Sequence, residues 1–66
     1  MEKEQIAKFV NKLNEEEQQV IRLRYGLDDN KPRTLFEVSE IMGISRERVR
    51  QIEEIAINKL RETDAK

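Results

Sequence analysis

The 66-residue sequence contains no cysteine and no histidine, and it has one proline and two glycines. The lack of cysteine excludes disulfides and thiolate zinc sites, and the lack of histidine removes the commonest general base. No apolar run approaches the ~20 residues of a membrane helix, and no signal-peptide pattern opens the chain. Without a nucleophile–base pair or a metal-ligand set, we expect no enzyme, no metal and no cofactor, but a single cytoplasmic domain.

Charge is abundant but balanced, with 13 basic and 14 acidic residues and a net charge of −1. Its distribution is uneven, because positions 22–50 hold seven bases and five acids, whereas the segments on both sides hold more acids than bases. Nucleic-acid affinity depends largely on phosphate neutralisation. Any DNA binding by this chain is therefore expected to be weak on its own.

The apolar pattern predicts an all-α domain with four helices, over about 6–13, 15–25, 35–42 and 46–61. Asn14 with Glu17, and Thr34 with Glu37, form capping-box patterns, and Ser45 is a third expected N-cap. Gly26 and Gly43 are expected to end the second and third helices, and 62–66 to fray. The expected inward-facing side chains of the third and fourth helices are Leu35, Val38, Ile41, Met42, Val49, Ile52, Ala56 and Leu60.

The segment from Leu35 to Ile52 has the plan of a helix-turn-helix, within a motif spanning about 34–62. Ser39 is small where the two helices would cross, and Gly43 stands in the turn, where a positive φ is usually needed. The alternative is an ordinary helical hairpin in which the glycine only ends a helix.

The stretch "SRERVRQIEE" places arginines at every second position of the fourth helix. With Val49 facing the core, successive steps of ~100° point Glu47 and Gln51 away from it. The same steps put Arg46 and Arg50 on one flank and Arg48 on the other. This layout suits a major groove, with cations toward the phosphates and hydrogen-bonding groups toward the bases.

The alternative for this stretch is a charge-stabilised surface helix, which would pair glutamate with arginine at i, i+4. Instead Arg46 is expected to face Arg50, a pair of like charges. Arg24 suits either a phosphate contact or the negative end of its own helix, and Lys31 and Arg33 are expected to be solvated. Phe36 and Ile55 extend the apolar surface as extra core or as an exposed docking patch.

The motifs "RYGL", "TLFEV" and "RERVRQIE" together resemble region 4, the C-terminal DNA-binding domain of sigma-70 family RNA polymerase sigma factors. The resemblance extends from about Leu13 to Arg61. It implies recognition of the −35 promoter element by double-stranded DNA contact, and docking of the first helices on the flap of the polymerase β subunit. It also implies that the chain is a fragment of a longer sigma factor.

The same resemblance assigns roles to individual residues. It implies base contacts by Arg46, Glu47 and Gln51, and phosphate contacts by Arg24, Thr34, Leu35, Arg48 and Arg50. Glu16, Phe36 and Ile55 depart from residues common in the family. Phe36 and Ile55 could instead bind an anti-sigma or activator protein, so an interaction module with little DNA contact is the second reading. A dimerising repressor is disfavoured because no segment remains for dimerisation, and a monomer is expected.

Overall fold

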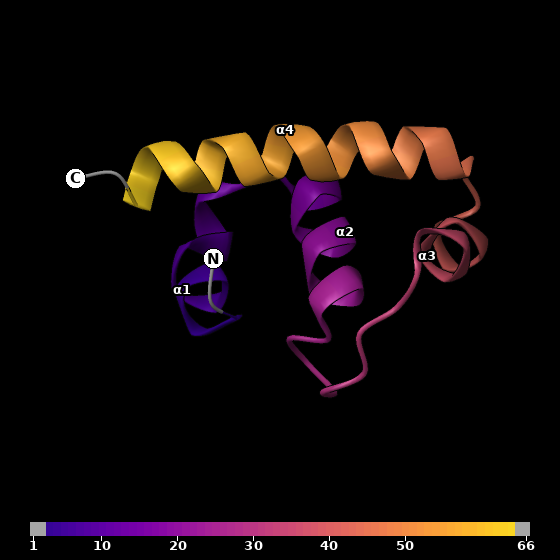
Figure 1. The fold of residues 1–66 in the computed structure, drawn as a ribbon, viewed down its shortest axis with the longest axis horizontal. Helices are drawn as coiled ribbons and strands as arrows, with labels where there is room; N and C mark the ends of the chain where they lie inside the picture. Colours follow the sequence, from indigo (N-terminus) through magenta and orange to yellow (C-terminus); the bar gives the residue numbers. More distant parts are fainter. Residues whose placement is uncertain (1–2, 65–66) are drawn as a thin grey trace.

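The computed structural model describes residues 3–64, which form four α-helices and one 3-10 turn without a strand. The elements are α1 (Lys3–Phe9), η1 (Val10–Lys12), α2 (Glu15–Tyr25), α3 (Leu35–Met42) and α4 (Arg46–Asp64). α4 runs along one side of the domain, and α1, α2 and α3 lie beneath it in succession, with α3 at its N-terminal end (Figure 1). The expected all-α class is confirmed.

Both predicted capping boxes are present. The Oδ1 atom of Asn14 accepts from the Glu17 N–H at 2.8 Å, and Glu17 Oε1 accepts from the Asn14 N–H at 3.0 Å. Thr34 and Glu37 repeat the exchange at 3.1 and 2.8 Å. Each box satisfies donors that the first helical turn leaves without partners, so the starts of α2 and α3 are fixed locally by sequence.

The turn between α3 and α4 consists of residues 43–45. Gly43 has a φ of +70°, and its N–H and that of Ile44 both donate to the Ser39 carbonyl, which closes α3. Ser45 Oγ then accepts from the Arg48 N–H at 3.0 Å and starts α4. The predicted helix-turn-helix geometry follows from this short connection.

The core consists of two clusters that share α4. The first joins α1, η1 and α2 to the C-terminal half of α4, and the second joins α2 and α3 to its N-terminal half. The four α4 residues expected to face inward are all buried, so α4 presents one fixed outward face along its length. The clusters comprise Ile6, Val10, Leu13, Ile21, Ala56 and Leu60 in the first, and Val20, Val38, Val49 and Ile52 in the second.

Three details of the predicted fold are wrong. The first helix was expected over about 6–13, but the α-helical part ends at Phe9 and the chain continues as the 3-10 segment Val10–Lys12. Ile41 is 53% exposed, whereas Ser39 is buried and donates its hydroxyl to the Phe36 carbonyl at 2.7 Å. The buried stripe of α3 is centred between Val38 and Ser39, and a position two residues after Ser39 lies ~110° from that centre. The predicted fraying is also wrong for residues 62–64, because α4 continues to Asp64, while 65–66 lie outside the described residues.

Within residues 3–64, no helix combines the length and the apolar character required for crossing a bilayer. The aspartate and glutamate residues of the described part of the chain also include no group of three placed to hold a metal ion.

Candidate nucleic-acid interface

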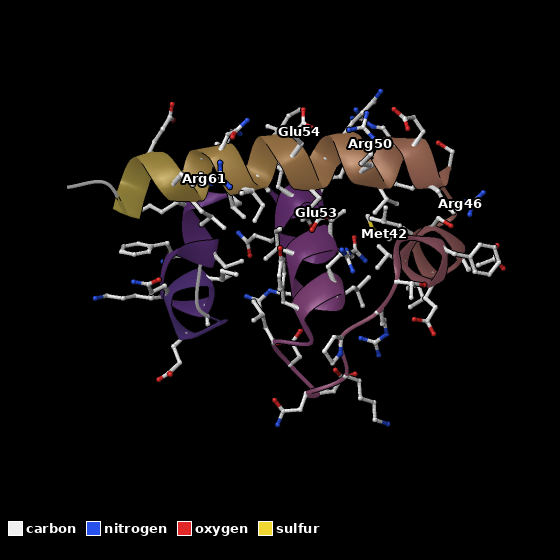
Figure 2. The ribbon with its side chains drawn as sticks, in the orientation of Figure 1. Met42, Arg46, Arg50, Glu53, Glu54 and Arg61 are labelled. Atoms are coloured by element: carbon white, nitrogen blue, oxygen red, sulfur yellow. The ribbon has the colours of Figure 1, made fainter. Side chains whose placement is uncertain are left out.

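The N-terminal ends of α3 and α4 open onto one shared groove. Arg46, Glu47 and Arg50 line it from α4, and Figure 2 shows the labelled Arg46 beside α3. Because Val49 is fully buried, it holds the opposite side of α4 against the core. The predicted outward orientation of Glu47 and Gln51 is confirmed, since both are exposed. The remaining lining residues are Thr34, Leu35, Phe36 and Ser45.

Arg50 is held by two carboxylates on its own helix. Its guanidinium lies 2.6 Å from Glu47 Oε2 and 3.2 Å from Glu54 Oε2. The hydrogen bond from Arg50, followed by its charge, lowers the pKa of Glu47 below the usual value. The view of this helix as lacking glutamate–arginine pairing is therefore wrong, because i, i+3 and i, i+4 pairs relieve the repulsion between Arg46 and Arg50.

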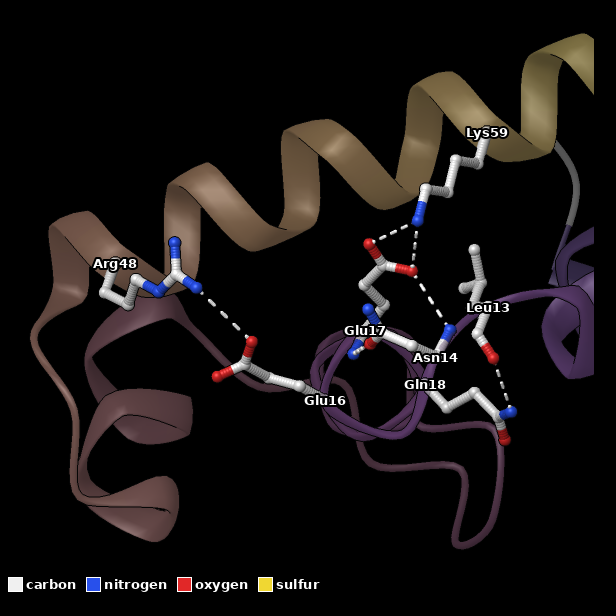
Figure 3. Close-up of polar contacts among 7 residues, drawn as sticks. All are labelled: Leu13, Asn14, Glu16, Glu17, Gln18, Arg48 and Lys59. Atoms are coloured by element: carbon white, nitrogen blue, oxygen red, sulfur yellow. Dashed lines mark hydrogen bonds and ion pairs between the residues drawn. The ribbon is translucent and has the colours of Figure 1, made fainter.

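Arg48 lies on the other flank and reaches across to α2. Its Nη2 atom is 3.4 Å from Oε1 of Glu16, and both side chains are about half exposed, at 49% and 48% (Figure 3). The contact joins the first turn of α2 to the first turn of α4. From the sequence, Glu16 was noted only as a departure from residues common in the family, since sequence spacing gives no indication of a partner 32 positions away.

Arg24 is tied into the fold and is absent from the groove lining. It donates to Glu53 Oε1 at 3.2 Å and to the Arg33 carbonyl at 2.6 Å, and so joins α2 to α4 and to the loop. Tyr25 also donates to Glu53, at 3.3 Å. Burial, followed by the charge of Glu53 and this hydrogen bond, raises the pKa of Tyr25.

Both loop cations, Lys31 and Arg33, were predicted to be solvated, and this prediction is wrong for Arg33. Arg33 pairs with Asp29 at 2.7 Å and donates to the Lys31 carbonyl at 3.2 Å. The hydrogen bond from Arg33, together with the Lys31 N–H, lowers the pKa of Asp29. These contacts order the 28–33 loop, which connects α2 to the start of α3.

Phe36 and Ile55 are both exposed, at 55% and 47%, so neither is extra core. The Phe36 ring lies 6.0 Å from the Arg46 guanidinium carbon, at the groove. Ile55 is nine positions further along α4, ~13 Å away and ~180° around the helix from Arg46. Phe36, which extends from α3 toward Arg46, and Ile55 on α4 therefore lie at opposite flanks of α4 and do not form one patch.

The profile of the "Sigma-70, region 4" family matches residues 9–62. The chain belongs to the sigma-70 region 4 family. It is also similar to the RNA polymerase sigma factor SigA of Bacillus sp, with 52% identity over 59 residues, which cover 89% of this chain. Those residues cover 16% of the relative, so the chain spans about a sixth of the length of that protein. The region 4 match includes α2, α3, the turn and all groove-lining residues.

Proposed function

We propose that this region 4 chain reads the −35 element of promoter DNA by placing the N-terminal half of α4 in the major groove. The observation that carries the proposal is the exposed ridge of Glu47 and Gln51, anchored from behind by the buried Val49. A helix whose polar ridge is rigidly held can present hydrogen-bonding groups to base edges in a fixed register.

Base readout is assigned to the ridge and its leading residue. Arg46 can pair with guanine, Glu47 can accept from cytosine N4, and Gln51 can pair with adenine. Within residues 3–64 Arg46 has no ion pair, and only the Phe36 ring lies against its guanidinium. Its charge is therefore available to a ligand, which makes it the best placed of the three to contact DNA without prior rearrangement.

Phosphate contacts are assigned to the flanks of α4 and to the start of α3. Arg48 and Arg50 lie on opposite flanks, as two phosphate walls require, and Arg24 is the third expected cation. The Thr34 N–H already donates to Glu37. The Leu35 N–H has no hydrogen-bond partner within residues 3–64, so it is one amide of this first turn that a phosphate oxygen can bind.

The RNA polymerase core is the second proposed partner. The relative's name describes a sigma factor of that enzyme, and the resemblance implies docking of the first helices on the β-flap. Partly buried apolar side chains on α1 and α2, including Phe9 and Tyr25, leave apolar area available for such a contact. Tethering would raise the effective concentration of a domain that binds DNA weakly.

A protein-interaction module with little DNA contact is the alternative function. The exposure of Phe36 and Ile55 favours it, since each could contact an anti-sigma or activator protein. Their separation on opposite flanks of α4 means that single substitutions should affect different partners. Replacing both by polar residues, with no loss of any partner in a pull-down, would remove this alternative.

A binding titration distinguishes the two functions. The chain and its Gln51→Ala variant are titrated at fixed salt against duplexes with a −35 element and with the same bases scrambled, with and without a β-flap peptide. Promoter reading predicts tighter binding to the −35 duplex and a smaller preference in Gln51→Ala. Equal affinity of the unmodified chain for both duplexes would contradict it.

A further inference from the structure

The arginines assigned to DNA are largely neutralised by the protein itself. Arg24, Arg48 and Arg50 each have a carboxylate within 3.4 Å. With Arg46 they supply four positive charges, whereas their four carboxylate partners supply four negative ones, so this set has no net charge. The four partners are Glu16, Glu47, Glu53 and Glu54.

Two of these carboxylates have no role in the recognition scheme. Glu47 is a proposed base reader, and Glu53 also accepts from Tyr25 inside the fold. Glu16 and Glu54 are exposed and make no other polar contact within residues 3–64. Each accepts a hydrogen bond from an arginine that is assigned to a phosphate contact. These two arginines, Arg48 and Arg50, lie on opposite flanks of α4.

A DNA phosphate would have to compete with these carboxylates for the same guanidinium groups. The carboxylates also repel an approaching phosphate, because both groups are negatively charged and would contact the same guanidinium groups. Exposed ion pairs are weak, so the competition lowers affinity without preventing binding. Fewer counterions should also be released from the DNA per complex, because a guanidinium whose charge is already offset by a carboxylate neutralises less phosphate charge.

We propose that Glu16 and Glu54 set the DNA affinity of this domain, by holding Arg48 and Arg50 in competition with phosphate. The inference rests on the proposed function, and it adds two residues outside the base-reading set. The competition explains how α4 can be rich in arginine while the chain is expected to bind DNA weakly unless it is docked on the polymerase.

The test compares each carboxylate with another glutamate for which the described part of the chain shows no arginine partner. Glu16→Gln is matched by Glu15→Gln, which makes the same charge change one position earlier in α2, where the described residues provide no ion pair. Glu54→Gln is matched by Glu62→Gln on the exposed side of α4, eight positions further along. All four sites are exposed, and circular dichroism checks that the helices are retained.

Affinity for the −35 duplex is measured at several salt concentrations. Glu16→Gln and Glu54→Gln should each tighten binding about two- to fivefold beyond their matched controls. They should also steepen the dependence of log K on log salt by up to about one unit. In an Arg48→Gln background the effect of Glu16→Gln should disappear, because its partner is gone.

The possible outcomes distinguish failure of this inference from failure of the proposed −35 recognition on which it rests. If the unmodified chain prefers the −35 duplex but Glu16→Gln and Glu54→Gln match their controls, the inference is wrong and the function stands. If the effect of Glu16→Gln persists in the Arg48→Gln background, the ion pair is not its cause. If neither the chain nor the Glu16→Gln, Glu54→Gln double variant prefers the −35 duplex, the proposed function fails and the inference with it.

Discussion

The Nζ atom of Lys59 lies 2.8 Å from Oε2 and 3.0 Å from Oε1 of Glu17, which joins α4 to the first turn of α2 across 42 positions of the sequence (Figure 3). The Glu17 side chain is 7% exposed and also accepts from the Asn14 N–H. One carboxylate therefore caps α2 and fixes its approach to α4, the helix proposed to read DNA.

Removing the cation of this pair should destabilise the fold. Lys59→Met keeps the apolar stem but leaves the Glu17 carboxylate without its strongest donor, so the free energy of unfolding should fall by about 1–2 kcal/mol. Lys12→Met, at an exposed position with no ion pair to a described residue, is the control and should change it by less than about 0.5 kcal/mol. Urea denaturation measures both, and equal changes would show that the pair contributes nothing.

Stability should fall on acidification, in part through Glu17. Burial alone would raise the pKa of this carboxyl, but hydrogen bonds from Lys59 and the Asn14 N–H, with the Lys59 charge, bring it below the ordinary 4.5. A lowered folded-state pKa contributes stability above the ordinary value, and that contribution is lost as pH falls through the lowered one. The pKa values of Asp29 and Glu47 are lowered too and add to the loss.

The Glu17→Gln variant isolates the contribution of this one carboxyl. Unfolding free energies measured from about pH 6 to about pH 3 should decline less steeply in the variant than in the unmodified chain. The remaining slope should come from Asp29 and Glu47, whose ion pairs the substitution leaves in place. Parallel curves for the two proteins would mean that Glu17 has the same pKa in the folded and unfolded chains.

Two glycines with similar backbone angles should respond very differently to alanine. Gly26 has a φ of +61°, and an added Cβ would lie 2.5 Å from the Lys31 nitrogen and 2.7 Å from the Pro32 nitrogen. Gly43 has a φ of +70°, but no atom lies within 4 Å of its Cβ position. Gly43→Ala should cost about 1 kcal/mol from backbone strain alone, and Gly26→Ala about 2–4 kcal/mol.

Thermal or urea unfolding of the two alanine variants measures this difference directly. The Gly43→Ala variant should also retain DNA binding, since its Cβ points into open space. Comparable losses of stability at the two sites would contradict the close backbone packing of the 28–33 loop against the end of α2.

The fold was predictable from the sequence wherever a local signal determines the structure. Capping boxes, positive-φ glycines and the 3.6-residue period gave the helix starts, the helix ends and the buried face of α4. Ile41 was misplaced because the small Ser39, and not the larger apolar side chain, is buried beside Val38 on the inner side of α3. Helix periodicity does not specify which of two adjacent stripes a neighbouring helix covers.

The candidate site was predictable in its orientation but not in its electrostatics. The helical wheel placed Glu47, Gln51 and the flanking arginines correctly relative to the core. It gave no indication of the pairs Arg48–Glu16 and Arg24–Glu53, because these join residues 32 and 29 positions apart. Such pairs depend on how α2 packs against α4, which only the tertiary structure provides.

The central claim is that the N-terminal half of α4 contacts the bases of the −35 element. The most direct test is a map of backbone and side-chain amide chemical-shift changes as the 66-residue chain is titrated with that duplex. The largest changes should fall on residues 46–51, including the Gln51 side-chain amide, and on residues 34–36 at the start of α3. Changes centred on α1 or on the C-terminal half of α4, with 46–51 unaffected, would contradict the claim.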